Sequence, residues 1–141
     1  MSCNSLSDNR RDKEAFANYI DRLKEKIRLK SIILFGSRAR GKGGRRSDYD
    51  ILVISDELPS DLHKRLSLLF EEKPGFIDAL GFKEDEIIDI IHRHFILKAI
   101  MEGKAIYGDC SLLKKMAEDY IKERNLVPTP FGYTHLTYIA K

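Results

Sequence analysis

The order of apolar and polar residues along the chain predicts helices that alternate with short strands. Apolar residues within 10–29 recur at the spacing of one helix face: Phe16, Tyr19, Ile20, Leu23 and Ile27. Short β-branched and aromatic runs at 31–35, 49–55 and 76–82 predict three buried strands, and 105–108 predicts a short edge strand. A second helix is expected to start at 59–61 and to end just before Lys73. Further helices are expected over 85–102 and over 111–125.

Individual residues sharpen these helix predictions. Asp8 or Asn9 could cap the first helix and Asp85 the third, which Gly103 would end. The second helix carries Leu62, Leu66, Leu69 and Phe70 on one face. A break within 85–102 is possible, and the expected buried stripe of that segment is Ile87, Ile88, Ile91, Phe95, Ile96 and Ile100.

The last sixteen residues differ from the rest of the chain, because they contain two prolines and show no helical period. We therefore expect one domain over residues 1–125 and an extended tail over 126–141. The tail holds Phe131, Tyr133 and Tyr138. These aromatic side chains could pack over the domain's own core, or they could dock to a partner or to a second copy of the chain.

Composition and charge limit the functions that remain. The 141 residues are 43% hydrophobic and 33% charged, as in an ordinary globular domain. The net charge of +3 is too small to suggest strong nucleic-acid binding. Five basic residues and no acid lie in the glycine-rich segment Gly36–Arg46, so the rest of the chain carries −2. The positive charge is therefore concentrated in one loop.

Targeting signals and cysteines add two expectations. The two cysteines, Cys3 and Cys110, have no metal-ligand spacing and form no disulfide framework, which fits a reducing cytoplasm. The N-terminus shows no apolar signal region, and the longest apolar runs are too short to span a membrane.

The residues that carry chemistry surround the basic loop. The first strand ends at Gly36-Ser37, and after ten intervening residues Asp48-Tyr49-Asp50 opens the second strand. Gly36 permits a sharp turn and a close approach of phosphate, to which Ser37 and the following backbone N–H groups can donate hydrogen bonds. Asp48 and Asp50 lie two residues apart, so in a strand they share one face and form a site for Mg²⁺.

Asp78, within the otherwise apolar third strand, is the candidate for a third carboxylate that would complete a two-metal site. Two alternatives remain at this point. The motif could be a glycine turn followed by two solvated aspartates, and Asp78 could face solvent at a strand edge. Tyr49 lies between the two aspartates, so we expect it to point to the opposite face and pack in the core.

The string GSRARG…SDYDILV resembles the signature of the DNA polymerase beta nucleotidyltransferase superfamily, in particular its minimal single-domain prokaryotic members. The order of elements extends this resemblance over about residues 10–107. The resemblance implies an α+β fold, in which a small mixed β-sheet packs against helices and carries the metal site on one face. It also implies transfer of a nucleoside monophosphate from ATP or another NTP to a hydroxyl, with release of pyrophosphate.

Residue by residue, the resemblance implies that Gly36 and Ser37 hold the triphosphate. Asp48 and Asp50 would bind two Mg²⁺ ions, and Asp78 would help one ion to activate the acceptor hydroxyl. Charge on the pyrophosphate could be offset by Arg38 first, then by Arg40 and Lys42.

Minimal nucleotidyltransferases are often paired with a helical HEPN-type protein, and some act as antitoxins that adenylylate a ribonuclease toxin. We therefore expect an enzyme that modifies a protein or RNA partner and acts as the antitoxin of such a pair. Two alternatives stay open: transfer to a small antibiotic-like molecule, and a non-catalytic module that masks its partner.

Overall fold

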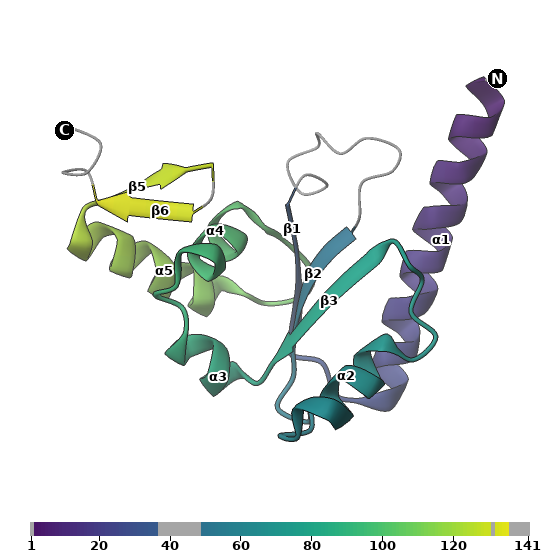
Figure 1. The fold of residues 1–141 in the computed structure, drawn as a ribbon, viewed down its shortest axis with the longest axis horizontal. Helices are drawn as coiled ribbons and strands as arrows, with labels where there is room; N and C mark the ends of the chain where they lie inside the picture. Colours follow the sequence, from purple (N-terminus) through teal and green to yellow (C-terminus); the bar gives the residue numbers. More distant parts are fainter. Residues whose placement is uncertain (1, 37–48, 131, 136–141) are drawn as a thin grey trace.

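The structure, a computed structural model, describes residues 2–36, 49–130 and 132–135 of the chain (Figure 1). The elements follow in the order α1 (Ser2–Lys26), β1 (Ser31–Phe35), β2 (Tyr49–Ile54), α2 (Leu62–Phe70), β3 (Ile77–Phe82), α3 (Glu84–Asp89), α4 (His94–Glu102), β4 (Lys104–Gly108), α5 (Ser111–Arg124), β5 (Leu126–Thr129) and β6 (Gly132–His135). No helix among these residues is long and apolar enough to cross a membrane.

The central sheet has four strands in the order β3-β2-β1-β4. β1 is antiparallel to both of its neighbours, whereas β2 and β3 run parallel, which makes the sheet mixed. The parallel pair is joined through α2, as the crossover between parallel neighbours requires. The expected α+β fold with a small mixed sheet is confirmed.

Helices cover both faces of this sheet (Figure 1). α1 and α2 pack on one face, with Tyr19, Leu23 and Leu69 buried against the sheet. α3, α4 and α5 cover the other face, where Ile87, Leu97 and Leu113 are among the buried residues. Because both faces are covered, the two central strands are almost continuously apolar, as is usual for buried strands.

Two helix starts differ from the sequence prediction. α1 begins at Ser2, so Asp8 and Asn9 lie inside the helix and do not cap it. Lys83, rather than Asp85, occupies the N-cap position of α3, and the Glu86 carboxylate accepts a hydrogen bond from the Lys83 backbone N–H at 2.8 Å. The possible break within 85–102 is confirmed, because α3 ends at Asp89 and α4 starts at His94.

The apolar face of α2 is only partly used in packing. Leu69 is buried, but Leu62, Leu66 and Phe70 are exposed to solvent. The other buried residue of α2 is charged: Arg65, which forms a network with β3 and α3. Helical spacing alone places apolar residues on one face, but it does not say whether that face meets the sheet.

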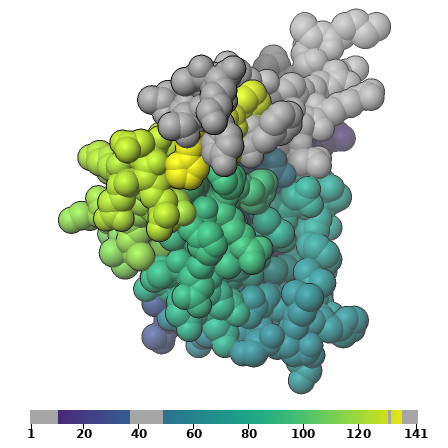
Figure 2. Space-filling model, turned by 60° about the vertical axis from the view of Figure 1, so that its left-hand side comes forward, coloured from purple at the N-terminus to yellow at the C-terminus, as the bar shows by residue number. Residues whose placement is uncertain are grey.

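The first part of the C-terminal tail forms a β-hairpin, which the sequence pattern did not indicate. β5 and β6 pair in antiparallel register, and Tyr133 is buried in the core beside α4 and α5. Figure 2 shows the hairpin and α5 next to each other on one face of the molecule. Gly132 has φ +152°, and a Cβ there would lie 2.6 Å from the Cβ of His94, so the hairpin approaches the start of α4 closely. Phe131 and Tyr138 lie outside the described residues.

Candidate active site

Two of the sequence-predicted carboxylates are neighbours across the parallel strand pair. Asp50 of β2 is the register partner of Asp78 of β3. Parallel neighbours are about 4.8 Å apart and partner residues project to the same face, so both side chains rise from the sheet at one place. Asp50 is half-buried and Asp78 is exposed.

The turn after β1 completes this corner of the sheet. Phe35 is the register partner of Asp50 on the antiparallel side, and Gly36 follows directly. Gly36 has φ +77°, and a Cβ at this position would lie 2.6 Å from Oδ2 of Asp50. Only glycine combines this backbone conformation with space beside the carboxylate.

The residues next to the two aspartates point to the other face of the sheet. Tyr49 and Ile77, themselves register partners, are both buried against α1 and α2. The Tyr49 ring stacks on Phe16 of α1 with 4.6 Å between ring centroids. The predicted core position of Tyr49 is confirmed, and the strand alternation therefore separates packing residues from carboxylates.

Two adjoining hollows open beside Asp50. The first, which we call the α4 hollow, has a volume of about 270 Å³ and is lined by Gly36, Lys98, Ala99, Glu102 and Pro130. The second, the β3 hollow, has a volume of about 320 Å³ and is lined by Asp78 and Leu80. Phe35, Asp50 and Phe95 line both. The carboxylate of Asp50 thus lies where the two hollows meet.

Lys98 connects the parts of the chain that form the α4 hollow. Its Nζ donates to the carbonyl of Thr129 in the hairpin and pairs with the carboxylate of Glu102, both at 2.8 Å. Burial, followed by the nearby charge of Glu102, raises the pKa of Tyr133 above its ordinary value. The hairpin is therefore fixed against α4 by the hydrogen bond from Lys98 to Thr129 and by a buried, uncharged phenol.

A divalent cation fits the donor set at this corner. Neighbouring carboxylates repel each other, a bound cation relieves that repulsion, and carboxylate oxygens are the ligands that Mg²⁺ prefers. The space beside Asp50 Oδ2, which a Cβ on Gly36 would fill, is consistent with a ligand there. Within the part of the chain that the structure describes, no group of three or more His, Cys, Asp or Glu could hold a metal ion. Asp48, the residue expected to bind the metal together with Asp50, lies outside that part.

The structure therefore brings together Gly36, Asp50 and Asp78. Ser37, Arg38, Arg40, Lys42 and Asp48 lie outside the described residues, and their roles stay predictions.

Sequence reasoning missed the residues of α4. Phe95 was expected in the buried stripe, but its side chain is 52% exposed beside the carboxylates, in edge contact with Phe35. The break before His94 changes the helical phase. A single buried face extended over 85–102 therefore assigns Phe95 to the wrong side. The i,i+4 spacing of Lys98 and Glu102 was the available signal for their ion pair.

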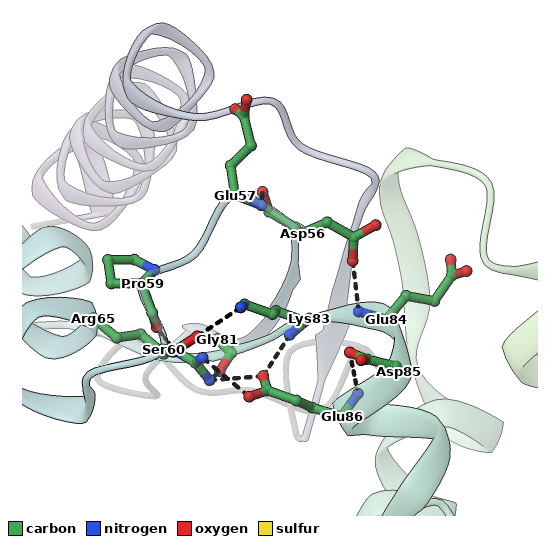
Figure 3. A network of polar contacts seen from close by, with 11 residues as sticks. Asp56, Glu57, Pro59, Ser60, Arg65, Gly81, Lys83, Glu84, Asp85 and Glu86 are labelled. Atoms are coloured by element: carbon green, nitrogen blue, oxygen red, sulfur yellow. Dashed lines mark hydrogen bonds and ion pairs between the residues drawn. The ribbon is translucent and has the colours of Figure 1, made fainter.

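A second polar network lies at the opposite end of β3 (Figure 3). The guanidinium of Arg65 forms two bonds with the Glu86 carboxylate, at 2.8 and 3.1 Å, and also donates to the carbonyls of Pro59 and Gly81. Hydrogen bonding from Arg65, followed by the bond from the Lys83 backbone N–H, holds the pKa of Glu86 below its ordinary value. The network ties α2, β3 and α3 together far from the aspartates, so we assign it a structural role.

Comparison with known proteins shows similarity over the region that carries this site. The family model for the nucleotidyltransferase domain matches residues 17–107. A protein of Methanocaldococcus jannaschii, provisionally named a protein adenylyltransferase, is 39% identical over 85 residues, which cover 60% of this chain and 82% of the relative. The matched family region includes Gly36, Asp50 and Asp78.

Solved structures agree with the fold. A crystal structure from Sulfolobus solfataricus, provisionally described as a nucleotidyltransferase, has a TM-score of 0.55 at 19% identity and covers 74% of this chain and 86% of its own. A crystal structure of a toxin–antitoxin with AMP-PNP has a TM-score of 0.50 at 23% identity, covering 77% and 86%. The sequence match, the mixed sheet and the paired aspartates under a glycine turn lead to one conclusion: the chain belongs to the nucleotidyltransferase domain family, as a minimal nucleotidyltransferase, an enzyme that transfers nucleotidyl groups.

Proposed function

We propose that the chain transfers AMP from ATP to a hydroxyl group of a protein or RNA partner and releases pyrophosphate. The observation that carries this proposal is the register pair of Asp50 and Asp78 beside the Gly36 turn. The name of the Methanocaldococcus relative, a protein adenylyltransferase, supports a protein acceptor. AMP-PNP in a structure of the same fold supports a nucleoside triphosphate donor.

Each site residue receives a role in this reaction. Asp50 and Asp78, together with Asp48, would hold Mg²⁺, which when bound offsets phosphate charge and makes the acceptor hydroxyl easier to deprotonate. Gly36 leaves room for the phosphates, and Ser37 would donate hydrogen bonds to them. Arg38, and after it Arg40 and Lys42, would balance the charge that develops on the pyrophosphate.

The transfer itself is a displacement at the α-phosphorus. The acceptor oxygen forms a bond to this phosphorus, and the bond from the α-phosphorus to the oxygen that bridges it to the β-phosphate breaks. The hydroxyl gives its proton to a carboxylate, a role we assign to Asp78, and pyrophosphate leaves with the bridging oxygen. Holding the donor and acceptor side by side removes much of the entropic barrier to their meeting.

We further propose that the acceptor belongs to a HEPN-type partner and that the chain serves as the antitoxin of the pair. The family resemblance of the GSRARG…SDYDILV string supports this partner, and a toxin–antitoxin of the same fold agrees with it. A cytoplasmic location and assembly through the C-terminal tail stay predictions.

Labelled ATP tests the reaction. The purified chain is added to an extract of its own source cells with Mg²⁺ and ATP labelled at the α- or at the γ-phosphate. We expect a macromolecule that becomes labelled from α-labelled ATP and not from γ-labelled ATP, and no labelling with Asp50→Asn. Nuclease and protease treatment identify the acceptor as RNA or protein. Absence of transfer from a folded chain that still binds its partner would instead support the masking module.

A further inference from the structure

The two hollows beside Asp50 differ in the residues that the reaction needs. Gly36, the phosphate-binding turn, lines the α4 hollow and is absent from the lining of the β3 hollow. Asp78, which we assign to the acceptor, lines only the β3 hollow. Asp50 lines both, as expected of a carboxylate at the point where donor and acceptor meet.

We propose that the α4 hollow binds the nucleoside part of the NTP and that Phe95 separates this nucleoside from the acceptor. This inference rests on the proposed function and adds a location for each substrate. The triphosphate must reach Gly36 and Asp50, so the rest of the donor enters the hollow that these two residues share. The acceptor hydroxyl then approaches from the β3 hollow, past Asp78.

The lining of the α4 hollow suits a nucleobase. Phe35 and Phe95 offer two aromatic rings, 5.5 Å apart between centroids and nearly perpendicular. A base can stack on an exposed ring face, and the half-exposed Phe95 provides one. Lys98 and Glu102 also line this hollow, and they supply a donor and an acceptor that can meet the polar edge of a base. The volume of about 270 Å³ is near the lower end for ligand pockets and suits a group the size of a nucleoside.

The wall of this hollow is held in place without the nucleotide. Lys98 bridges Glu102 and Thr129, and Gly132 of the hairpin touches His94, the first residue of α4. The hairpin therefore has a role beyond covering the core: it closes the side of the hollow that Pro130 lines. Phe95 lies one residue from that contact, which fixes the position of its backbone.

Calorimetric titration in excess Mg²⁺ tests the assignment on the full chain. The probes are α,β-methylene-ATP, which cannot be cleaved at the reacting bond, and tripolyphosphate, which lacks the nucleoside. We expect Phe95→Ala to weaken binding of the nucleotide roughly tenfold, the magnitude of one lost stacking contact, and to leave tripolyphosphate binding unchanged. Phe70→Ala is the matched control, because Phe70 is also an exposed phenylalanine but lies on α2. It should bind both probes as the wild type does.

Three results would overturn the assignment. Phe95→Ala could bind the nucleotide as tightly as the wild type, or it could lose the same factor for both probes. Leu80→Ala, at the wall of the β3 hollow, could weaken nucleotide binding while Phe95→Ala does not. That result would place the nucleoside in the β3 hollow. Circular dichroism and the milder Phe95→Leu check that the fold is intact. Failure of the proposed function looks different, since the wild type would then bind no nucleotide and transfer no label.

Discussion

The two faces of the sheet differ most at the end where β2 and β3 begin. On one face Tyr49 and Ile77 are buried under α1 and α2, and the core continues to the strand ends. On the other face, which α4 covers, the next residues along the chain are Asp50 and Asp78. These two residues are not part of the core but line the two hollows. The same two dipeptides thus contribute one residue to packing and one to chemistry.

This difference shows how a small domain can hold like charges close together. Strand alternation places the carboxylates on one face, while the apolar partners on the other face hold the strands in register. A slip of one residue would bury both aspartates, which is costly for charged groups. The packing face therefore fixes the geometry of the chemical face, and substitutions on the two faces should have separable effects.

The largest effect is expected from Asp50→Asn, which removes a negative charge from the point where the hollows meet. Transfer of α-label should fall about 10³-fold, because several kcal/mol of metal-dependent stabilisation is lost. The free energy of unfolding, measured with urea, should change by less than about 1 kcal/mol. If the variant lost several kcal/mol of unfolding free energy together with its activity, the effects on the two faces would not be separable.

Tyr49→Ala makes the converse change. Removing a buried aromatic side chain that stacks on Phe16 should cost about 3 kcal/mol of unfolding free energy. Nucleotide binding per folded molecule should remain close to that of the wild type, because the side chain faces away from the aspartates. Urea denaturation and calorimetry on the same preparation measure both quantities. A stable variant that cannot bind nucleotide would contradict the division between the faces.

Gly36→Ala should affect both properties to an intermediate degree. The positive φ should cost about 1 kcal/mol, and the new Cβ would press on Oδ2 of Asp50, which reduces nucleotide affinity as well. Gly75→Ala is the matched control, since a Cβ there meets nothing within 4 Å. Thermal unfolding and nucleotide titration should distinguish the two variants, and identical behaviour would argue against the close approach at Gly36.

The smallest effect concerns the network at the far end of β3. The pKa of Glu86 is lower in the folded chain, chiefly because of Arg65, than its ordinary value of 4.5. Its stabilising contribution is therefore present above that value and is lost as the pH falls through the folded pKa. Because the Glu86 side chain is 38% exposed, we expect less than about 1 kcal/mol. Urea titrations from pH 7 down to 3 should show a shallower decline of the unfolding free energy for Glu86→Gln than for the wild type. Parallel curves would mean that Glu86 does not contribute to the pH dependence.

The sequence predicted the parts of the site that depend on local spacing. Strand alternation predicted that Tyr49 and Asp50 face opposite sides of the sheet, and this correctly placed Tyr49 in the core. The direct pairing of Asp50 with Asp78 depends on register between strands that are far apart in sequence, so the sequence could suggest Asp78 but not its exact partner.

Residues whose position depends on tertiary contacts could not be predicted in the same way. Phe95 carries an apolar side chain at helical spacing, but the break before α4 rotates it toward the aspartates. Arg65 is buried although three apolar residues of the same helix are exposed, because Glu86 and two carbonyls satisfy its charge. The hairpin forms between two short segments, the first of which contains Pro128, with no alternation strong enough to indicate strands.

The most direct test of the central claim is a double-mutant cycle on the paired aspartates. Transfer of α-label from ATP is measured for Asp50→Asn, Asp78→Asn and the double variant. If the two carboxylates act as one site, each single change should remove nearly all of the activity, and the double variant should be about as active as either single variant. Losses that multiply, or an Asp78→Asn variant as active as the wild type, would contradict a shared site.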